Sequence, residues 1–345
     1  MKKNIIFILV LSIIISILSI IYYNSDNMKE IKTLIKTGYS KEDVNKILNV
    51  FNEDVDCLYN NYLENIDKLL NNQNFKSSNK CEYIKYITKN NVSYDIGIEM
   101  VNAKLDNYDY SDILYSIKND PYFLLRNVDR YINYYKNNSS LDSRSIVSKV
   151  NSNIDYEYYS NIQMVNNPDF LVIVNKYYAL DENYVPNTLV DIDSLYGYGK
   201  VDKTLYDNFK IMADEARKLN LNLYIASGYR SYEYQKVLYN GYLKYDPVNI
   251  VDTFSARPGH SEHQTGLAID LSPIDDSFAY TKEYSWLKDN AHKYGFILRY
   301  PNNFVDLTGY KYEPWHYRYV GVDVATYIYN NNITFDEYYE FYLKH

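Results

Sequence analysis

Pro258-Gly-His-Ser-Glu-His-Gln-Thr-Gly-Leu-Ala-Ile-Asp-Leu-Ser272 is the stretch from which both the fold and the chemistry of this chain can be argued. Its second half, 267–271, alternates like a strand, so that its two leucines and its isoleucine share one face and Asp270 lies on the other. A carboxylate within an apolar strand costs several kcal/mol unless it is paired or binds a metal. Asp270 is therefore a candidate metal ligand, although it could instead cap the turn at Ser272-Pro273.

Histidines are scarce, and three of the five fall in two short segments: His260, His263, His292, His316 and His345 make up the whole set. His263 precedes Asp270 across Gly266, whose freedom at positive φ lets the chain fold back. This spacing alone is weak evidence for a shared metal site.

The second histidine segment, Tyr312-Glu-Pro-Trp-His-Tyr-Arg-Tyr-Val-Gly321, strengthens that evidence. Pro314 pushes Glu313 toward extended geometry, so this is not the helical H-E-x-x-H arrangement. A Glu close to a His suits a general base beside a metal ligand. Two His and one Asp would leave the fourth zinc position open for water, as catalytic sites do. A regular strand would separate Glu313 from His316, so we expect a bend between them.

A third segment, 227–235, follows an apolar run and leads into a predicted helix. Arg230 on such a turn can present its guanidinium to a carboxylate or to a developing oxyanion. The alternative is an ordinary surface arginine.

The order of the predicted elements favours an α+β domain over 139–345. Strand-like runs cover 170–174, 221–226, 267–271, 296–300 and 317–320, and helical patterns cover 203–219, 231–245 and 285–294. The region 28–138 is expected to be all-α, with Ser40 and Asp43 forming a capping box before the apolar stripe of 44–51. This region contains no histidine, and its role is expected to be that of a spacer or of a binding site for an unknown protein partner.

The amino terminus predicts a membrane anchor within 1–27. Lys2 and Lys3 precede an apolar run over 5–21 that is long enough to span a bilayer, and Tyr22 and Tyr23 suit the interface. A cleaved signal peptide is the alternative, but the run is long and no small-residue cleavage site follows it. With positive charge inside, everything after Tyr23 is expected outside the cytoplasm, as a single-pass membrane protein with an extracytoplasmic catalytic domain.

The composition and net charge of the chain argue against nucleic-acid binding. The 345 residues are 46% hydrophobic, and 36 basic against 44 acidic residues give a net charge of −8. Nucleic-acid binding requires a basic face, so no nucleic acid is expected as a partner.

Cys57 and Cys81 are either a structural disulfide, worth about 3 kcal/mol, or two unpaired thiols. They are catalytic in neither case.

Four segments together resemble the VanY-type D-alanyl-D-alanine carboxypeptidases, which belong to the lysostaphin/D-Ala-D-Ala group of zinc metallopeptidases. They are Ser227-Gly-Tyr-Arg-Ser231, Ser261-Glu-His-Gln-Thr-Gly-Leu-Ala-Ile-Asp270, Trp286-Leu287 with Tyr294-Gly-Phe-Ile-Leu-Arg-Tyr-Pro301, and Glu313-Pro-Trp-His-Tyr-Arg-Tyr-Val-Gly321. The resemblance covers roughly 160–345. It implies a small antiparallel sheet flanked by helices, with one Zn²⁺ in a cleft.

The resemblance also implies roles for individual residues. By position in the motifs, the zinc ligands are His263, Asp270 and His316, the catalytic base is Glu313, and Arg230 engages the substrate or its tetrahedral intermediate. Ser261 and Gln235 match substrate-side positions. Tyr229 and Trp315 are expected to pack, and His260 is expected at the rim of the cleft.

The function implied is removal of the C-terminal D-Ala from peptidoglycan stem peptides by attack of a zinc-bound water. An L,D-carboxypeptidase or a peptidoglycan endopeptidase with the same zinc site is the alternative, because specificity lies in loops that the motifs do not describe. A non-catalytic wall-binding sensor is a third interpretation, which the intact ligands and base disfavour.

Overall fold

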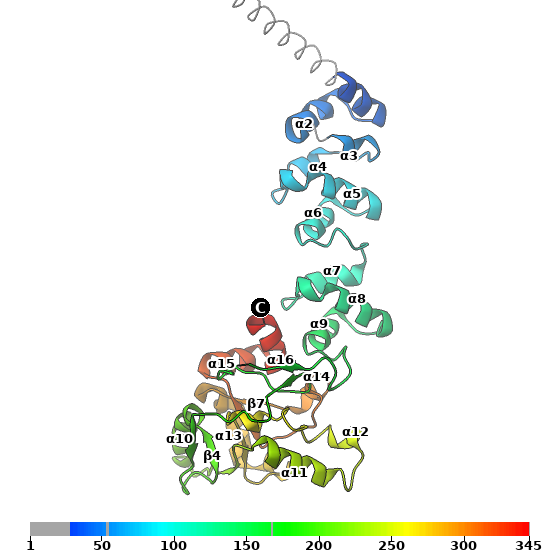
Figure 1. The fold of residues 1–345 in the computed structure, drawn as a ribbon. Helices are drawn as coiled ribbons and strands as arrows, with labels where there is room; N and C mark the ends of the chain where they lie inside the picture. The colour runs from blue at the N-terminus through cyan, green and yellow to red at the C-terminus, as the bar shows by residue number, and fades with distance from the viewer. Residues whose placement is uncertain (1–27, 53–54, 167, 345) are drawn as a thin grey trace, which may run out of the picture. The chain divides into compact units, whose positions relative to one another are not determined.

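The computed structural model describes residues 28–52, 55–166 and 168–344 (Figure 1). The chain forms two compact units, the first ending at Asn119 and the second running from Asp120 to His345. The sequence-based boundary after residue 138 falls inside the second unit. The predicted membrane segment lies outside the described residues. Within the described ranges, no helix is both long enough and apolar enough to cross a membrane.

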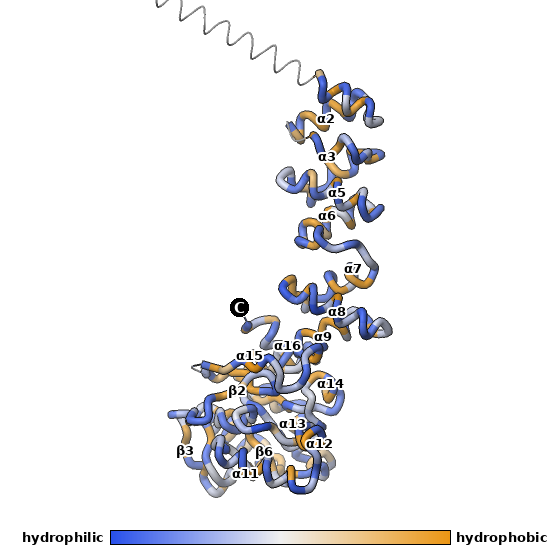
Figure 2. The backbone as a smooth tube through the Cα atoms, turned by 45° about the vertical axis from the view of Figure 1, so that its right-hand side comes forward, coloured by the Kyte–Doolittle hydropathy of each residue, from blue (hydrophilic) through white to orange (hydrophobic). Residues whose placement is uncertain are grey.

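The first unit is all-α over its described residues, as the sequence predicts. Residues 28–37 are helical, and the later elements are α2 (Lys41–Phe51), α3 (Asp56–Tyr59), α4 (Asp67–Leu70), η1 (Ser77–Asn79), α5 (Lys80–Asn90), α6 (Tyr94–Asn102) and α7 (Asp112–Lys118). Polar and apolar residues interleave along these helices (Figure 2). The predicted capping box starts α2, because Ser40 accepts from the Asp43 N–H and the Asp43 carboxylate accepts from the Ser40 N–H. Val44, Ile47 and Phe51 of the predicted stripe are buried.

A disulfide joins Cys57 on α3 to Cys81 on α5, which confirms the first of the two sequence-based alternatives. The bond closes a loop with a sequence separation of 24 residues. Short helices such as α3 are marginal by themselves. The covalent link therefore fixes a weak element to a longer helix.

Replacing both cysteines by serine is expected to destabilise the first unit by about 3 kcal/mol, because the open chain regains loop entropy on unfolding. Denaturant unfolding of the full chain, followed by hydrogen exchange, would locate the change in residues 28–119. Reductant should reproduce the shift in the wild-type protein and have no effect on the double variant. An equal loss of protection in the second unit would contradict this local role.

One local hydrogen-bond arrangement occurs twice, a feature that the sequence analysis missed. The Tyr83 hydroxyl donates to Asn102 Oδ1 over 2.7 Å, and the Tyr131 hydroxyl donates to Asn151 Oδ1 over 2.7 Å. In both copies the tyrosine oxygen also accepts a backbone N–H seven residues earlier in the chain. The first copy belongs to the first unit and the second copy to the second unit. The same tyrosine–asparagine contact therefore recurs in the helices of both units.

The second unit mixes short strands with helices, as expected for an α+β domain. Its strands are β1 (Gln163–Met164), β2 (Tyr178–Ala179), β3 (Leu189–Asp191), β4 (Lys200–Asp202), β5 (Ile225–Ser227), β6 (Ala268–Leu271), β7 (Phe296–Leu298) and β8 (His316–Tyr319). Its α-helices are α8 (Val128–Asn137), α9 (Ser143–Asn151), α10 (Lys203–Arg217), α11 (Tyr232–Tyr242), α12 (Val248–Val251), α13 (Lys282–Asn290), α14 (Val305–Thr308), α15 (Val322–Asn331) and α16 (Phe335–Tyr338). Single turns of other helix types are η2 (Leu125–Asn127), η3 (Glu262–Thr265), η4 (Asp276–Tyr280), η5 (Ala291–Tyr294), η6 (Asn302–Phe304) and η7 (Tyr339–Leu343).

Four strands form the central sheet in the order β5-β6-β8-β7, and every pair is antiparallel. β3 and β4 form a separate antiparallel pair, and β1 pairs with β2 in parallel. The small antiparallel sheet implied by the family resemblance is therefore present.

The strand predicted over 170–174 is wrong. This run is a turn followed by irregular chain, although Val172 and Val174 are buried in the core. Two backbone carbonyl groups of this run are satisfied without strand pairing, because the Arg318 guanidinium donates to the carbonyl oxygens of Phe170 and Val172. The apolar residues of 170–174 therefore indicated that the run is buried, but not that it forms a strand.

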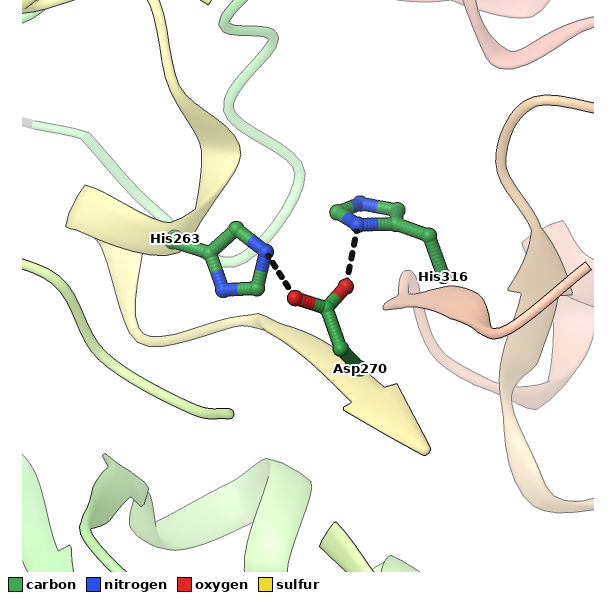
Figure 3. Close-up of side chains that lie close together, drawn as sticks. All are labelled: His263, Asp270 and His316. Carbon is green, nitrogen blue, oxygen red and sulfur yellow. Dashed lines mark hydrogen bonds and ion pairs between the residues drawn. The ribbon is translucent and has the colours of Figure 1, made fainter. Parts of the chain in front are cut away.

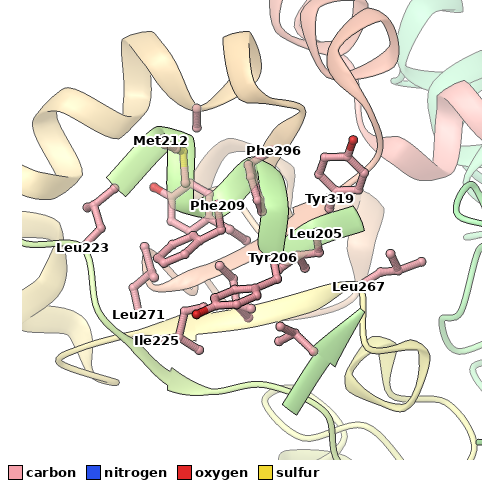
Figure 4. Packing of buried hydrophobic residues seen from close by; sticks show 14 of the residues in the cluster. Leu205, Tyr206, Phe209, Met212, Leu223, Ile225, Leu267, Leu271, Phe296 and Tyr319 are labelled. Carbon is pink, nitrogen blue, oxygen red and sulfur yellow. The ribbon is translucent and has the colours of Figure 1, made fainter. Parts of the chain in front are cut away.

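The core of the second unit lies between α10 and the central sheet. Asp202 caps α10 by accepting from the Thr204 and Leu205 N–H groups. Phe209 and Met212 of this helix, both fully buried, face the apolar side chains of the sheet (Figure 4). Because Leu271 of β6 points into this core, its neighbour Asp270 points to the opposite face of the sheet. The core thus positions the face that carries the site.

Candidate active site

Two of the predicted metal ligands are direct neighbours in the sheet. Asp270 of β6 is paired in register with His316 of β8, and also with Ser227 of β5. Residues directly opposite in antiparallel strands have side chains on the same face. His316 Nδ1 lies 2.9 Å from Asp270 Oδ1 (Figure 3). The pairing of the sheet thus brings together residues that are far apart in the sequence.

His263 approaches Asp270 from the short helix η3, which ends at Gly266 with φ of 71°. This left-handed conformation folds the chain back, as the sequence predicts. His263 Nδ1 lies 2.7 Å from the Gly228 carbonyl oxygen. A carbonyl only accepts, so Nδ1 carries the proton and the lone pair is on Nε2. That atom lies 3.3 Å from Asp270 Oδ2 (Figure 3).

The donor set fits a zinc ion. His263, Asp270 and His316 are buried, and one ligand atom from each lies within 4.8 Å of the other two. Two imidazoles and one carboxylate are typical of a catalytic zinc site. Burial raises the pKa of Asp270, but the charges of His263 and Arg230 outweigh it and hold the pKa well below the ordinary value. A metal-binding carboxylate has to be ionised, and this shift keeps Asp270 in that form.

Glu313 lies beside this cluster, because the expected bend is present. Residues 314–315 form a turn, and the His316 N–H donates to the Glu313 carbonyl over 3.1 Å. Glu313 Oε2 consequently lies 3.8 Å from His316 Nδ1. Burial raises the pKa of Glu313 to about 7, with the charge of His316 opposing the shift. A carboxylate with a pKa near neutrality can accept and return a proton.

The site opens into a cleft of about 830 Å³. Its lining includes all seven predicted site residues: Arg230, Gln235, Ser261, His263, Asp270, Glu313 and His316. Arg230 Nε donates to Ser227 Oγ over 3.0 Å, and its Nη2 pairs with Asp270 Oδ2. Arg230 is thus a fixed cation at the wall of the cleft and not a free surface arginine.

The two predicted substrate-side residues are both buried at the edge of the cleft. Gln235, on α11, donates through Nε2 to the Ala256 carbonyl, and its Oε1 has no hydrogen-bond partner among the described residues. Ser261 directly precedes η3. Tyr229 and Trp315 also line the cleft, and Trp315 packs against the core as expected.

His260 does not lie at the rim of the cleft, where the sequence analysis expected it. It is buried, its Nδ1 lies 2.7 Å from the Asn175 carbonyl oxygen, and it does not line the cleft. The rim position expected for it is wrong, because the turn before η3 directs this ring into the protein and not toward the cleft. It makes an edge contact with Tyr159.

Several residues of the quoted motifs have contacts that the sequence analysis did not predict. Gly228 and Ser227 orient His263 and Arg230. The buried side chain of Glu262, which also lines the cleft, forms ion pairs with Arg299 and Arg318. A signal for the arginines existed: each follows or interrupts a run of apolar and aromatic residues, as Asp270 does, and a buried charge requires a partner.

Comparisons with known proteins agree with this geometry. Residues 199–322 match the model of the VanY family, described as D-alanyl-D-alanine carboxypeptidase. "Putative carboxypeptidase YodJ" of Bacillus subtilis is 40% identical over 199 residues, which cover 54% of this chain and 73% of that protein. The D-alanyl-D-alanine carboxypeptidase of Enterococcus faecalis is 33% identical over 177 residues, which cover 49% of this chain and 65% of that protein.

A solved structure is similar in fold as well as in sequence. The LdcB LD-carboxypeptidase matches with a TM-score of 0.50 and 40% identity, over 53% of this chain and 91% of that chain. The matched family region contains all of the cluster around Asp270, and the helices before it lie outside the match. With a relative at 40% identity over most of its own length, and with the motif residues converging in one cleft, the chain belongs to the VanY family of D-alanyl-D-alanine carboxypeptidases.

Proposed function

We propose that the second unit is a zinc metallopeptidase that removes the C-terminal D-Ala from peptidoglycan stem peptides. The convergence of His263, Asp270 and His316 beside Glu313 carries this proposal. The three side chains would hold the ion through His263 Nε2, an Asp270 oxygen and His316 Nδ1. When bound, Zn²⁺ would supply Lewis acidity, lowering the pKa of water toward about 7 and polarising a carbonyl group.

Side chains of the cleft would transfer the proton, stabilise the developing charge and bind the substrate. Glu313 accepts the proton of the attacking water and returns it to the leaving amine, a task suited to a carboxyl with a pKa of about 7. Arg230 offers its positive charge at the cleft wall to the substrate carboxylate or to the developing oxyanion. Gln235 and Ser261 offer further polar contacts to the peptide.

We also propose that the chain acts outside the cytoplasm, anchored by the apolar run over 5–21. The charge of Lys2 and Lys3 and the length of the run support this orientation. The stem peptides of the wall would then lie on the same side of the membrane as the cleft.

A second specificity is favoured by one specific observation. The LdcB structure, with 40% identity, is that of an LD-carboxypeptidase. The same cleft chemistry would then release the terminal residue from a tetrapeptide and not from a pentapeptide.

Muropeptides of defined length would distinguish the two activities. The full chain with zinc is expected to convert a stem pentapeptide to a tetrapeptide with release of one D-Ala, observed by mass spectrometry. A chelator should abolish the conversion, because the metal is required. Conversion of tetrapeptide to tripeptide alone would favour the L,D-specificity. Zinc-loaded protein that leaves both substrates intact would overturn the proposed function.

A further inference from the structure

Glu262 is a buried residue of the cleft lining next to His316, and it belongs to neither the predicted ligands nor the base. Its side chain is 0% exposed, and its Oε2 lies 3.6 Å from His316 Nε2. Among the described residues, neither of these two atoms has a hydrogen-bond partner within standard distance. A buried polar atom without a partner is costly, and here two such atoms face each other.

Two arginines engage the other oxygen of the same carboxylate. Arg299 Nε donates to Glu262 Oε1 over 2.8 Å, and Arg318 Nη1 lies 3.2 Å from that oxygen. Arg299 is held in turn by Asp336, whose carboxylate accepts from both Nη atoms over 2.7 and 3.2 Å. The carboxylate is therefore fixed in orientation, with Oε1 toward the guanidinium groups and Oε2 toward the imidazole.

This orientation gives the Nε2–H of His316 an acceptor when Nδ1 is used to bind a metal. Without a metal, Asp270 Oδ1 at 2.9 Å from Nδ1 and Glu262 Oε2 at 3.6 Å from Nε2 can both accept a proton from the ring. A metal ion held by Nδ1 requires the lone pair there, and the one remaining ring proton is then on Nε2, facing the carboxylate oxygen that can accept it. His263 shows the mirror arrangement, because the Gly228 carbonyl holds the proton on Nδ1 and leaves Nε2 toward Asp270.

We propose that Glu262 is a positioning residue that holds His316 in the Nε2–H tautomer and thereby aims Nδ1 at the metal. The inference rests on the proposed zinc site. It assigns to the buried Glu262–Arg299–Asp336 chain a role in metal affinity beyond packing. Outer carboxylates that accept from a ligating histidine commonly change metal affinity by about 10–100-fold.

Glu262→Gln is a sharp test, because the amide can fill the same space but not the same role. Arg299 and Arg318 only donate, so the amide oxygen must stay on their side. The amide NH₂ then faces His316 Nε2 and can only donate. The ring would have to accept at Nε2 and carry its proton on Nδ1, where the metal should bind.

The measurement is the zinc dissociation constant of the full chain, obtained by competition with a chromophoric chelator. Glu262→Gln is expected to weaken zinc binding by about 10–100-fold. Glu340→Gln is a matched control, because Glu340 is an equally buried carboxylate of the same unit, paired with Lys344 and absent from the cleft lining. This control is expected to lose stability and to keep wild-type zinc affinity. Equal zinc affinity in Glu262→Gln and wild type would overturn the inference.

A second measurement does not depend on the folding of any variant. In the zinc-loaded wild-type chain labelled with ¹⁵N-histidine, His316 is expected to show a slowly exchanging Nε2–H and a metal-shifted Nδ1. A proton on Nδ1, or the metal on Nε2, would overturn the role of Glu262 while leaving the proposed function intact. A wild-type chain that binds no zinc would instead overturn the proposed function, and this inference with it.

Discussion

Glu313→Gln is expected to lower turnover of the stem peptide by about 10²–10⁴-fold, the contribution typical of a positioned general base. The amide keeps the size of the side chain but cannot accept the proton of the attacking water. Zinc affinity should stay near wild type, because Glu313 is not among the three converging ligands and lies 3.8 Å from His316 Nδ1. Steady-state kinetics on a muropeptide and a zinc-binding titration measure the two quantities separately.

Glu337→Gln is the matched control for this variant. Glu337 is also a buried carboxyl whose pKa is raised by burial, but it caps α16 by accepting from the Thr334 N–H and does not line the cleft. Its substitution should affect stability and leave turnover unchanged. If Glu313→Gln retained normal turnover while binding zinc, Glu313 would not be the base, and the proposed mechanism would be wrong.

The sequence predicted the elements that a local pattern specifies. Alternation at 267–271 predicted β6 and the face that its leucines and isoleucine share, which is buried in the core. The capping box of Ser40 is present for the same reason, since its contacts lie within one turn. The strand predicted over 170–174 was wrong, because the apolar residues there are buried without strand pairing. Two of its carbonyl groups accept hydrogen bonds from Arg318 of a distant strand instead.

The sequence predicted which residues form the candidate site, but not how their side chains are oriented. The spacing of the motifs indicated which side chains should meet, and the structure places all seven in one cleft. What spacing could not provide was orientation. The register of Asp270 with His316 arises from a pairing of β6 with β8 across intervening elements. The choice of imidazole nitrogen depends on Gly228 and Glu262, which are partners that no local pattern identifies.

Asp270→Asn is expected to weaken zinc binding and to lower activity together, which distinguishes it from Glu313→Gln. Asp270 contacts both histidines and contributes the negative charge of the ligand set. Its replacement should weaken zinc binding by more than about 100-fold, beyond the 10–100-fold usual for outer residues. It would also leave Arg230, which pairs with Asp270, as an uncompensated cation facing the place where the ion binds. Like charge at that point further opposes a divalent cation.

The fold should survive this substitution, because Arg230 lies at the cleft wall with its side chain 19% exposed and can be hydrated. Asp252→Asn is the matched control: Asp252 is another buried aspartate paired with an arginine, Arg257, and it does not line the cleft. Both variants should lower the melting temperature, but only Asp270→Asn should lose zinc in a chelator competition. Zinc bound at wild-type affinity by Asp270→Asn would mean that the two imidazoles hold the ion without this carboxylate, and the ligand set would have to be reassigned.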